Sequence, residues 1–161
     1  MTAQNIVIRE MRKSEYPLLE DFLYKAIFIP EGTEPPPRDI LSAPELRVYV
    51  DGFGEFADDR CFVAEANGKI IGAVWTRIMD DYGHIDDDTP SFAISLYKEY
   101  RGQRIGTALM RTMLDELEKA GYRQASLSVQ KANRAVNLYR RVGFETISEN
   151  DEEYIMVKHF R

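Results

Sequence analysis

The stretch YRGQRIGTAL, from Tyr100 to Leu109, carries two arginines and two glycines within six consecutive residues. A helical pattern follows it, and the first turn of a helix presents backbone N–H groups without intrahelical acceptors, together with a partial positive charge. Glycine lets the backbone approach a ligand closely, and arginine can bind phosphate through two hydrogen bonds. The stretch therefore predicts an anion-binding turn at the start of a helix.

Regular patterns lie on both sides of this turn. Residues 91–97, SFAISLY, are typical of a β-strand, and residues 104–120 have the period of an amphipathic helix whose end is marked by Gly121. The apolar stripe of that helix comprises Gly106, Leu109, Met110, Met113, Leu114 and Leu117. The turn is thus expected between the carboxyl end of a strand and the start of a helix.

The other segments also alternate between strand and helix patterns. Strands are expected at residues 6–10, 61–66, 69–79, 125–129, 144–147 and 153–160, with Asn67 and Gly68 in a hairpin turn. Helices are expected at residues 14–28, with Ser14 as the N-cap, at 45–50 and at 135–142, and the proline-rich residues 29–39 form a loop over a site. This order predicts an α/β domain with a mixed sheet, in which helix-linked strands of the second half pair in parallel.

Composition limits the class of protein. With 161 residues, 44% of them hydrophobic, the chain is expected to form one domain over residues 1–161. The net charge of −6 argues against general binding to nucleic acid or to an anionic membrane, and no apolar run approaches the roughly 20 residues that span a bilayer. The first residues lack a secretory signal pattern, and the single Cys61 allows no intramolecular disulfide, so a cytoplasmic location is expected. The scattered His and Cys residues predict no metal site.

The element order and the turn together resemble the GNAT superfamily of acyl-CoA-dependent N-acyltransferases. Its pyrophosphate-binding signature begins with Gln or Arg and continues, after two residues, with Gly, any residue, and Gly or Ala. Arg101 matches the first position and Gly106 the last, whereas Arg104 stands where the family usually has glycine. The resemblance implies that residues 101–107 bind coenzyme A, its pyrophosphate held by backbone N–H groups. That set comprises Arg101, Gly102, Gln103, Arg104, Ile105, Gly106 and Thr107.

A second stretch carries the same resemblance. NRAVNLYRRVGF, residues 133–144, is similar to a later family signature, in which an asparagine opens a helix and Gly-Phe begins the next strand. The resemblance implies that Asn133 contacts the pantetheine or the reaction region and that Tyr139 lies near the thioester sulfur. It also implies a mixed, mainly antiparallel sheet of six to seven strands flanked by about four helices, without a metal cofactor. On spacing alone, Tyr139 lies on the apolar stripe of its helix, which favours a core position over a catalytic one.

The implied reaction is transfer of an acetyl group from acetyl-CoA to a primary amine. Tyr139, with an ordinary pKa of about 10, is protonated at neutral pH and can donate to the departing thiolate as general acid. A backbone N–H near Leu96 can polarise the thioester carbonyl. The general base stays open: Ser91 occupies the position where many family members carry glutamate, and Asp88, His84 or a water chain are alternatives.

The acceptor is expected to be a small-molecule or peptide amine. The stretch DDYGHIDDD has five aspartates in the nine residues from Asp80 to Asp88, so we expect it to attract a cationic acceptor, with a solvated surface turn as the alternative. A second interpretation of the whole chain is a coenzyme A-binding regulatory module without turnover. The resemblance also allows a homodimer.

Overall fold

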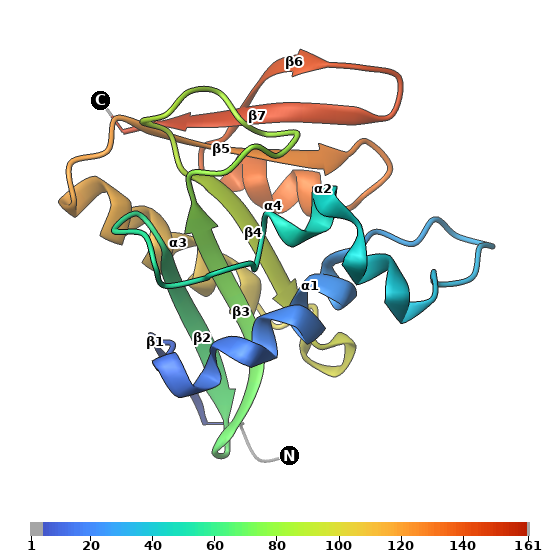
Figure 1. Cartoon of the computed structure of the whole chain (residues 1–161), viewed down its shortest axis with the longest axis vertical. Coiled ribbons are helices and arrows are strands. Elements are labelled where there is room, and N and C mark those ends of the chain that lie inside the picture. The colour runs from blue at the N-terminus through green and yellow to red at the C-terminus, as the bar shows by residue number, and fades with distance from the viewer. Residues whose placement is uncertain (1–4, 161) are drawn as a thin grey trace.

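A computed structural model describes residues 5–160 as a seven-stranded sheet covered by helices on both faces (Figure 1). The strand order is β1-β2-β3-β4-β5-β7-β6. The strands are β1 (Ile6–Glu10), β2 (Arg60–Ala66), β3 (Lys69–Arg77), β4 (Ser91–Leu96), β5 (Gln124–Gln130), β6 (Glu145–Glu149) and β7 (Glu153–His159). The α-helices are α1 (Leu19–Ala26), α2 (Pro44–Arg47), α3 (Ile105–Lys119) and α4 (Ala135–Arg141), and short 3-10 helices span Lys13–Leu18, Arg38–Ser42 and Lys98–Tyr100. The expected mixed, mainly antiparallel sheet with four helices is confirmed.

The sheet consists of two antiparallel halves joined along one edge of β4. Strands β1 to β4 pair antiparallel in sequence order, and β7 pairs antiparallel with both β5 and β6. Between the halves, β4 and β5 are parallel and share a single registered pair, Ser91 with Ser126. In Figure 1, β2 to β4 follow the long axis of the view, whereas β5, β7 and β6 run across it. The two halves therefore diverge toward the carboxyl ends of β4 and β5.

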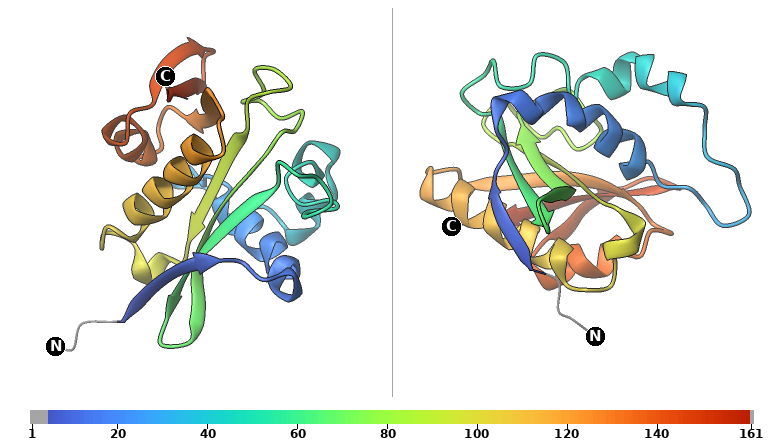
Figure 2. Two further views of the ribbon diagram at one scale, coloured as in Figure 1. Left: turned by 90° about the vertical axis from the view of Figure 1, so that its left-hand side faces the viewer. Right: turned by 90° about the horizontal axis from the view of Figure 1, so that it is seen from below.

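Two apolar clusters fill the space on the two faces. Helix α3 covers one face, while α1 and α2 lie over the other (Figure 2). The α3 cluster includes Leu109, Met110 and Met113, which are fully buried and contact apolar residues of β5 and α4. The second cluster is built around Trp75 and Phe22, also buried. Among the described residues, no helix is both long and apolar enough to cross a membrane.

Local sequence signals place most elements correctly. The β2–β3 hairpin turns at Asn67 and Gly68, whose φ angles of 52° and 82° are those of a type I′ turn. Parallel pairing in the second half occurs only between β4 and β5, however. We expected it for β6 as well, but β7 inserts between β5 and β6, so that these two strands run parallel without touching.

Two helix predictions near the N-terminus are wrong. Ser14 is not an N-cap: it lies inside the 3-10 helix Lys13–Leu18, whose first turn is closed by the Glu15 carboxylate, which accepts the Arg12 N–H at 2.7 Å. The helix expected at 45–50 ends at Arg47. The chain continues from there in hydrogen-bonded turns, and the Arg77 guanidinium donates to the carbonyls of Val48 and Asp51, at 3.2 and 2.8 Å.

Arg77 connects β3 to the segment after α2. Its guanidinium forms two 3.1 Å hydrogen bonds to the Asp59 carboxylate, and the two side chains are only 4% and 1% exposed. The indole N–H of Trp75 donates to the Tyr49 carbonyl at 3.1 Å. These contacts fix the segment that carries Tyr49 against the sheet.

Asp59→Asn should destabilise the protein by about 3–5 kcal/mol, because it leaves the buried Arg77 cation without its counter-ion. Asp51→Asn is the matched control: its carboxylate pairs with Arg47 and is 61% exposed, so the loss should stay below about 1 kcal/mol. Urea unfolding of both variants measures the difference. Equal stabilities would contradict the role assigned to the buried pair.

Candidate functional site

The divergence of β4 and β5 opens a cavity of about 260 Å³ between the two halves of the sheet. Helix α1 contributes Leu23 from one face, and α4 contributes Tyr139 from the other. Ile94 of β4 and Ser128 of β5 form parts of its two strand walls. The cavity is therefore lined from both faces of the sheet.

Tyr139 lines this cavity from α4. Its ring is 8% exposed and packs edge-on against Phe144 with the ring centroids 6.2 Å apart. Burial raises the pKa of Tyr139 to about 12, so the hydroxyl stays protonated at neutral pH. No partner for this hydroxyl is found among residues 5–160. The structure thus places a protonated, unpaired donor in the cavity, on the edge of the α3 core rather than sealed inside it.

Asn133 lies beside Tyr139 and lines the same cavity. Its side-chain oxygen accepts the N–H of Ala135, the first residue of α4, at 2.9 Å. This bond explains why asparagine can open the helix, since it satisfies one of the free N–H groups of the first turn. Asn133 therefore caps the first turn of α4 and also forms part of the cavity wall.

The predicted anion-binding turn forms at the N-terminus of α3, next to the carboxyl end of β4. Gly102 and Arg104 adopt left-handed conformations, with φ of 77° and 66°. Glycine adopts such a conformation without cost, which gives a physical reason for the family's glycine at the position of Arg104. No acceptor within the described chain binds the N–H groups of residues 103–107, and the first turn of α3 has no acidic side chain.

The turn does not itself line the cavity. It lies close to β4 and to α4, and each of these elements provides one wall of the cavity. Arg101 Nε donates to the Leu96 carbonyl at 3.3 Å. A Cβ atom added to Gly106 would lie 3.5 Å from Leu138 Cδ2 on α4. The turn therefore lies between the end of β4 and the helix that carries Tyr139.

The backbone of Leu96 is oriented toward the gap between the strands. The N–H of Tyr97 donates to Ile71 of β3 at 2.9 Å, and successive residues of a strand direct their N–H groups to opposite edges. The N–H of Leu96 thus points away from β3, on the side where β5 has diverged. Leu96 is not among the residues that line the cavity, so its role as a donor to a bound carbonyl stays a prediction.

Sequence reasoning missed a partly buried chain of hydrogen-bonded polar side chains on the α1 side of the cavity. Tyr49, which lines the cavity, donates to Asp81 Oδ2 at 3.2 Å, and Ser91 Oγ donates to Asp81 Oδ1 at 3.0 Å. Burial raises the pKa of Asp81, against the opposing effect of these hydrogen bonds, and it also raises the pKa of Tyr49. Tyr49 follows a short helix and Asp81 is one of five aspartates in its stretch, so neither carried a distinguishing signal.

Neither of the two side chains considered as general base lines the cavity, and Ser91 does not line it either. Ser91 is fully buried and donates to Asp81. His84 Nδ1 lies 2.9 Å from the Met79 carbonyl. Asp88 is exposed. The Tyr49–Asp81 pair, by contrast, brings a carboxylate into contact with a side chain of the cavity.

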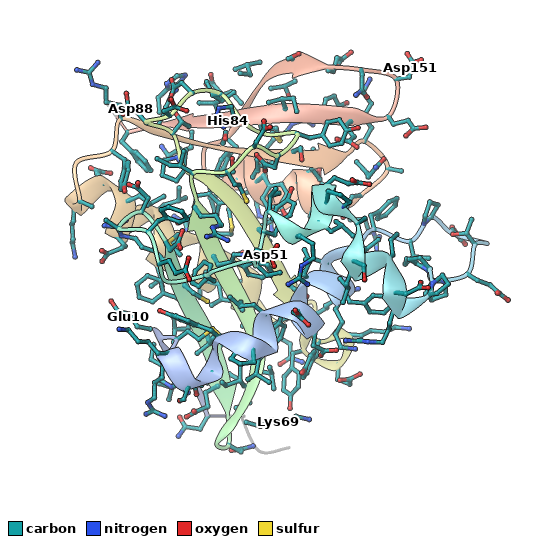
Figure 3. The ribbon with its side chains drawn as sticks, in the orientation of Figure 1. Glu10, Asp51, Lys69, His84, Asp88 and Asp151 are labelled. Carbon is teal, nitrogen blue, oxygen red and sulfur yellow. The ribbon has the colours of Figure 1, made fainter. Side chains whose placement is uncertain are left out.

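The acidic residues Asp86, Asp87 and Asp88 lie elsewhere. They border a separate depression together with Gly121 and His159, not the cavity between β4 and β5. Asp151 lies in the turn that connects β6 and β7, and Figure 3 shows Asp88 at the opposite end of this part of the sheet. The expectation that these three carboxylates attract an acceptor into the site therefore has no support in the geometry, because the loop directs only Tyr82 into the cavity.

Comparisons with known proteins agree with this fold. The sequence profile of the acetyltransferase (GNAT) family matches residues 21–144. The probable N-acetyltransferase camello of Xenopus tropicalis is 37% identical over 91 residues, which cover 55% of this chain and 40% of that protein. The [ribosomal protein bS18]-alanine N-acetyltransferase of Escherichia coli (strain K12) is 33% identical over 92 residues, covering 55% of this chain and 58% of that protein. The chain thus matches about half of these relatives' length.

Among solved structures, the PaiA N-acetyltransferase of Thermoplasma acidophilum, in complex with coenzyme A, has the same fold. It superposes with a TM-score of 0.71 at 20% sequence identity, covering 97% of this chain and 99% of that chain. With the matched profile, the splayed β4–β5 pair and the glycine-containing turn before α3, the protein belongs to the acetyltransferase (GNAT) family.

Proposed function

We propose that the protein is an N-acetyltransferase that transfers an acetyl group from acetyl-CoA to a primary amine. The observation that carries the proposal is the position of Tyr139: a protonated, unpaired hydroxyl in the cavity, on the helix next to a turn of free N–H groups. A regulatory module without turnover would need the turn, but it would not need this donor. Measured release of free thiol from acetyl-CoA with a mixed panel of amines separates these alternatives.

Coenzyme A would be held by residues 101–107. Five free N–H groups, the positive end of α3 and two exposed arginines suit a pyrophosphate, whereas two arginines at a helix start are unfavourable without an anion. The thioester end would then extend toward Asn133 and Tyr139, through the gap between β4 and β5. The N–H of Leu96 would donate to the carbonyl oxygen there, which would stabilise the negative charge that develops during attack.

Two proton movements complete the reaction. As the C–N bond forms and the C–S bond breaks, the departing thiolate takes up a proton, and Tyr139 is placed to donate it. The amine loses a proton on the α1 side of the cavity, where Tyr49 can accept it while passing its own proton to Asp81. Burial raises the pKa of Asp81, which narrows the difference in proton affinity between the carboxylate and the amine.

Gly106→Val should weaken acetyl-CoA binding by about tenfold or more, because branched methyl groups would fill the space between α3 and Leu138 beside the anion-binding turn. Gly106→Ala is the matched control, since its Cβ would meet Leu138 at 3.5 Å, an ordinary contact. Isothermal titration calorimetry measures the affinities, and circular dichroism checks the fold. If the folded valine variant binds acetyl-CoA as the parent does, the turn is not the coenzyme site.

Tyr139→Phe should lower kcat by about 10²–10⁴ and change acetyl-CoA affinity by no more than a few-fold, as for loss of a general acid. Steady-state kinetics with the best amine of the panel measures kcat, and thermal melting measures stability. A variant with a lower melting temperature and an unchanged kcat would instead assign Tyr139 to the core.

Tyr49→Phe should lower kcat/KM by about 10²-fold at neutral pH, because the amine loses its route to Asp81. The deficit should shrink as pH rises, since a larger fraction of the amine is then already neutral. Tyr82→Phe is the control, as Tyr82 also lines the cavity but is 71% exposed. A pH-independent deficit, or equal effects of the two substitutions, would argue against the Tyr49–Asp81 route.

A further inference from the structure

The two faces of the cavity can be assigned from strand register. Leu127 of β5 pairs with Met156 of β7, and both belong to the cluster under α3. Because side chains alternate along a strand, Gln130 and its registered partner Glu153 lie on the opposite face, the face covered by α1 and α2. Glu153 therefore lies on the acceptor side, away from the proposed coenzyme site.

Glu153 is the only charged side chain that lines the cavity within the described chain. Gln130 Nε2 donates to its Oε1 at 3.2 Å, and no Lys or Arg of residues 5–160 forms an ion pair with it. Lys131, close in sequence, pairs with Glu149 at 3.5 Å and lies over the Tyr154 ring. Partial burial, followed by repulsion from Glu152, raises the pKa of Glu153. A half-buried carboxylate without a counter-ion favours a bound cation.

Apart from the polar side chains of Ser128 and Gln130, the other walls on the acceptor side are apolar or aromatic. They comprise Leu23, Ile27, Phe28, Leu46, Tyr49 and Tyr82. A polyamine or an aminoglycoside would bring several charges to a surface that offers one carboxylate, and each unpaired charge would lose hydration there. The volume of about 260 Å³ lies just below the range of typical ligand sites, roughly 300 to 1,000 Å³, which favours a small acceptor group.

We propose that the acceptor is a monocationic primary amine with an apolar or aromatic group close to its nitrogen, and that Glu153 binds the ammonium while the apolar walls hold that group. This inference rests on the proposed function and narrows it to a class of substrate. The chemistry is shared by free arylalkylamines and by peptide N-termini whose first side chain is apolar. The acceptor is still expected to be a cation. The carboxylate that attracts it, however, is Glu153 inside the cavity and not Asp86, Asp87 or Asp88.

Binding measurements can test this class without requiring turnover. The protein is first saturated with coenzyme A, and each probe is then titrated by calorimetry. The probes are 2-phenylethylamine, its uncharged analogue 2-phenylethanol, spermidine, and a tripeptide amide that begins with phenylalanine. Binding of 2-phenylethylamine, of the tripeptide amide or of both shows which kind of molecule supplies the apolar ammonium. Spermidine should bind at least about tenfold more weakly than the tighter-binding of these two probes.

Glu153→Gln should weaken the apolar amine by about tenfold or more and leave 2-phenylethanol unchanged, because only the charged probe uses the carboxylate. Glutamine can still contact Gln130, and unchanged coenzyme A affinity shows that the variant is folded. Two controls should bind all probes like the parent: Glu152→Gln, a neighbouring exposed carboxylate outside the cavity, and the combined Asp86→Asn, Asp87→Asn and Asp88→Asn variant.

The outcomes separate this inference from the proposed function. If the parent fails to bind coenzyme A, the proposed function itself is contradicted. If coenzyme A binds but neither apolar ammonium does, or spermidine binds more tightly than both, the substrate class is wrong. Equal affinity of the parent and Glu153→Gln for the apolar amine would overturn the role of Glu153.

Discussion

The whole site depends on where the pairing of β4 with β5 stops. One registered pair, Ser91 with Ser126, holds the two halves of the sheet together, and the strands then separate. Beyond that point the backbone N–H and C=O groups of β4 and β5 have no strand partner across the gap. Buried backbone groups need a hydrogen-bond partner, so these groups are available to another part of the protein, to water or to a ligand. In this fold the unpaired edge of β4 carries the N–H of Leu96, and the cavity lies in the gap between β4 and β5.

Each layer of helices then supplies a different chemical environment to that cavity. The α3 and α4 side combines free N–H groups, exposed arginines and a protonated tyrosine, which suits an anionic ligand with a leaving group. The α1 and α2 side combines apolar walls with Glu153 and with the carboxylate of Asp81 behind Tyr49. A sheet that continued unbroken would keep these two environments apart, so the divergence of the strands is what brings both to one cavity.

The α1 and α2 side of the cavity depends on a second interaction, the buried Arg77–Asp59 ion pair, which holds the segment that carries Tyr49. A short helix such as α2 has little intrinsic stability, and its neighbouring carbonyls are satisfied by Arg77 rather than by further helical turns. Trp75 holds the same segment through the Tyr49 carbonyl. The position of the Tyr49 hydroxyl beside Asp81 is thus set by a charge pair buried in the sheet, not by the local sequence around Tyr49.

The sequence by itself determined most of the elements, the turn before α3 and the helix α4, which follows Asn133 and carries Tyr139, because these features depend on local rules: alternation, helical period, glycine at turns and charge at a helix start. Contacts between segments distant in sequence were decided by the tertiary structure alone. Local patterns could not reveal that β7 inserts between β5 and β6, that Asp81 rather than Asp86, Asp87 or Asp88 reaches the cavity wall, or that Glu153 is the carboxylate inside it. Along the chain all of these acids are alike, and only strand register and burial give them different surroundings, since desolvation and hydrogen bonding depend on which neighbours the fold supplies.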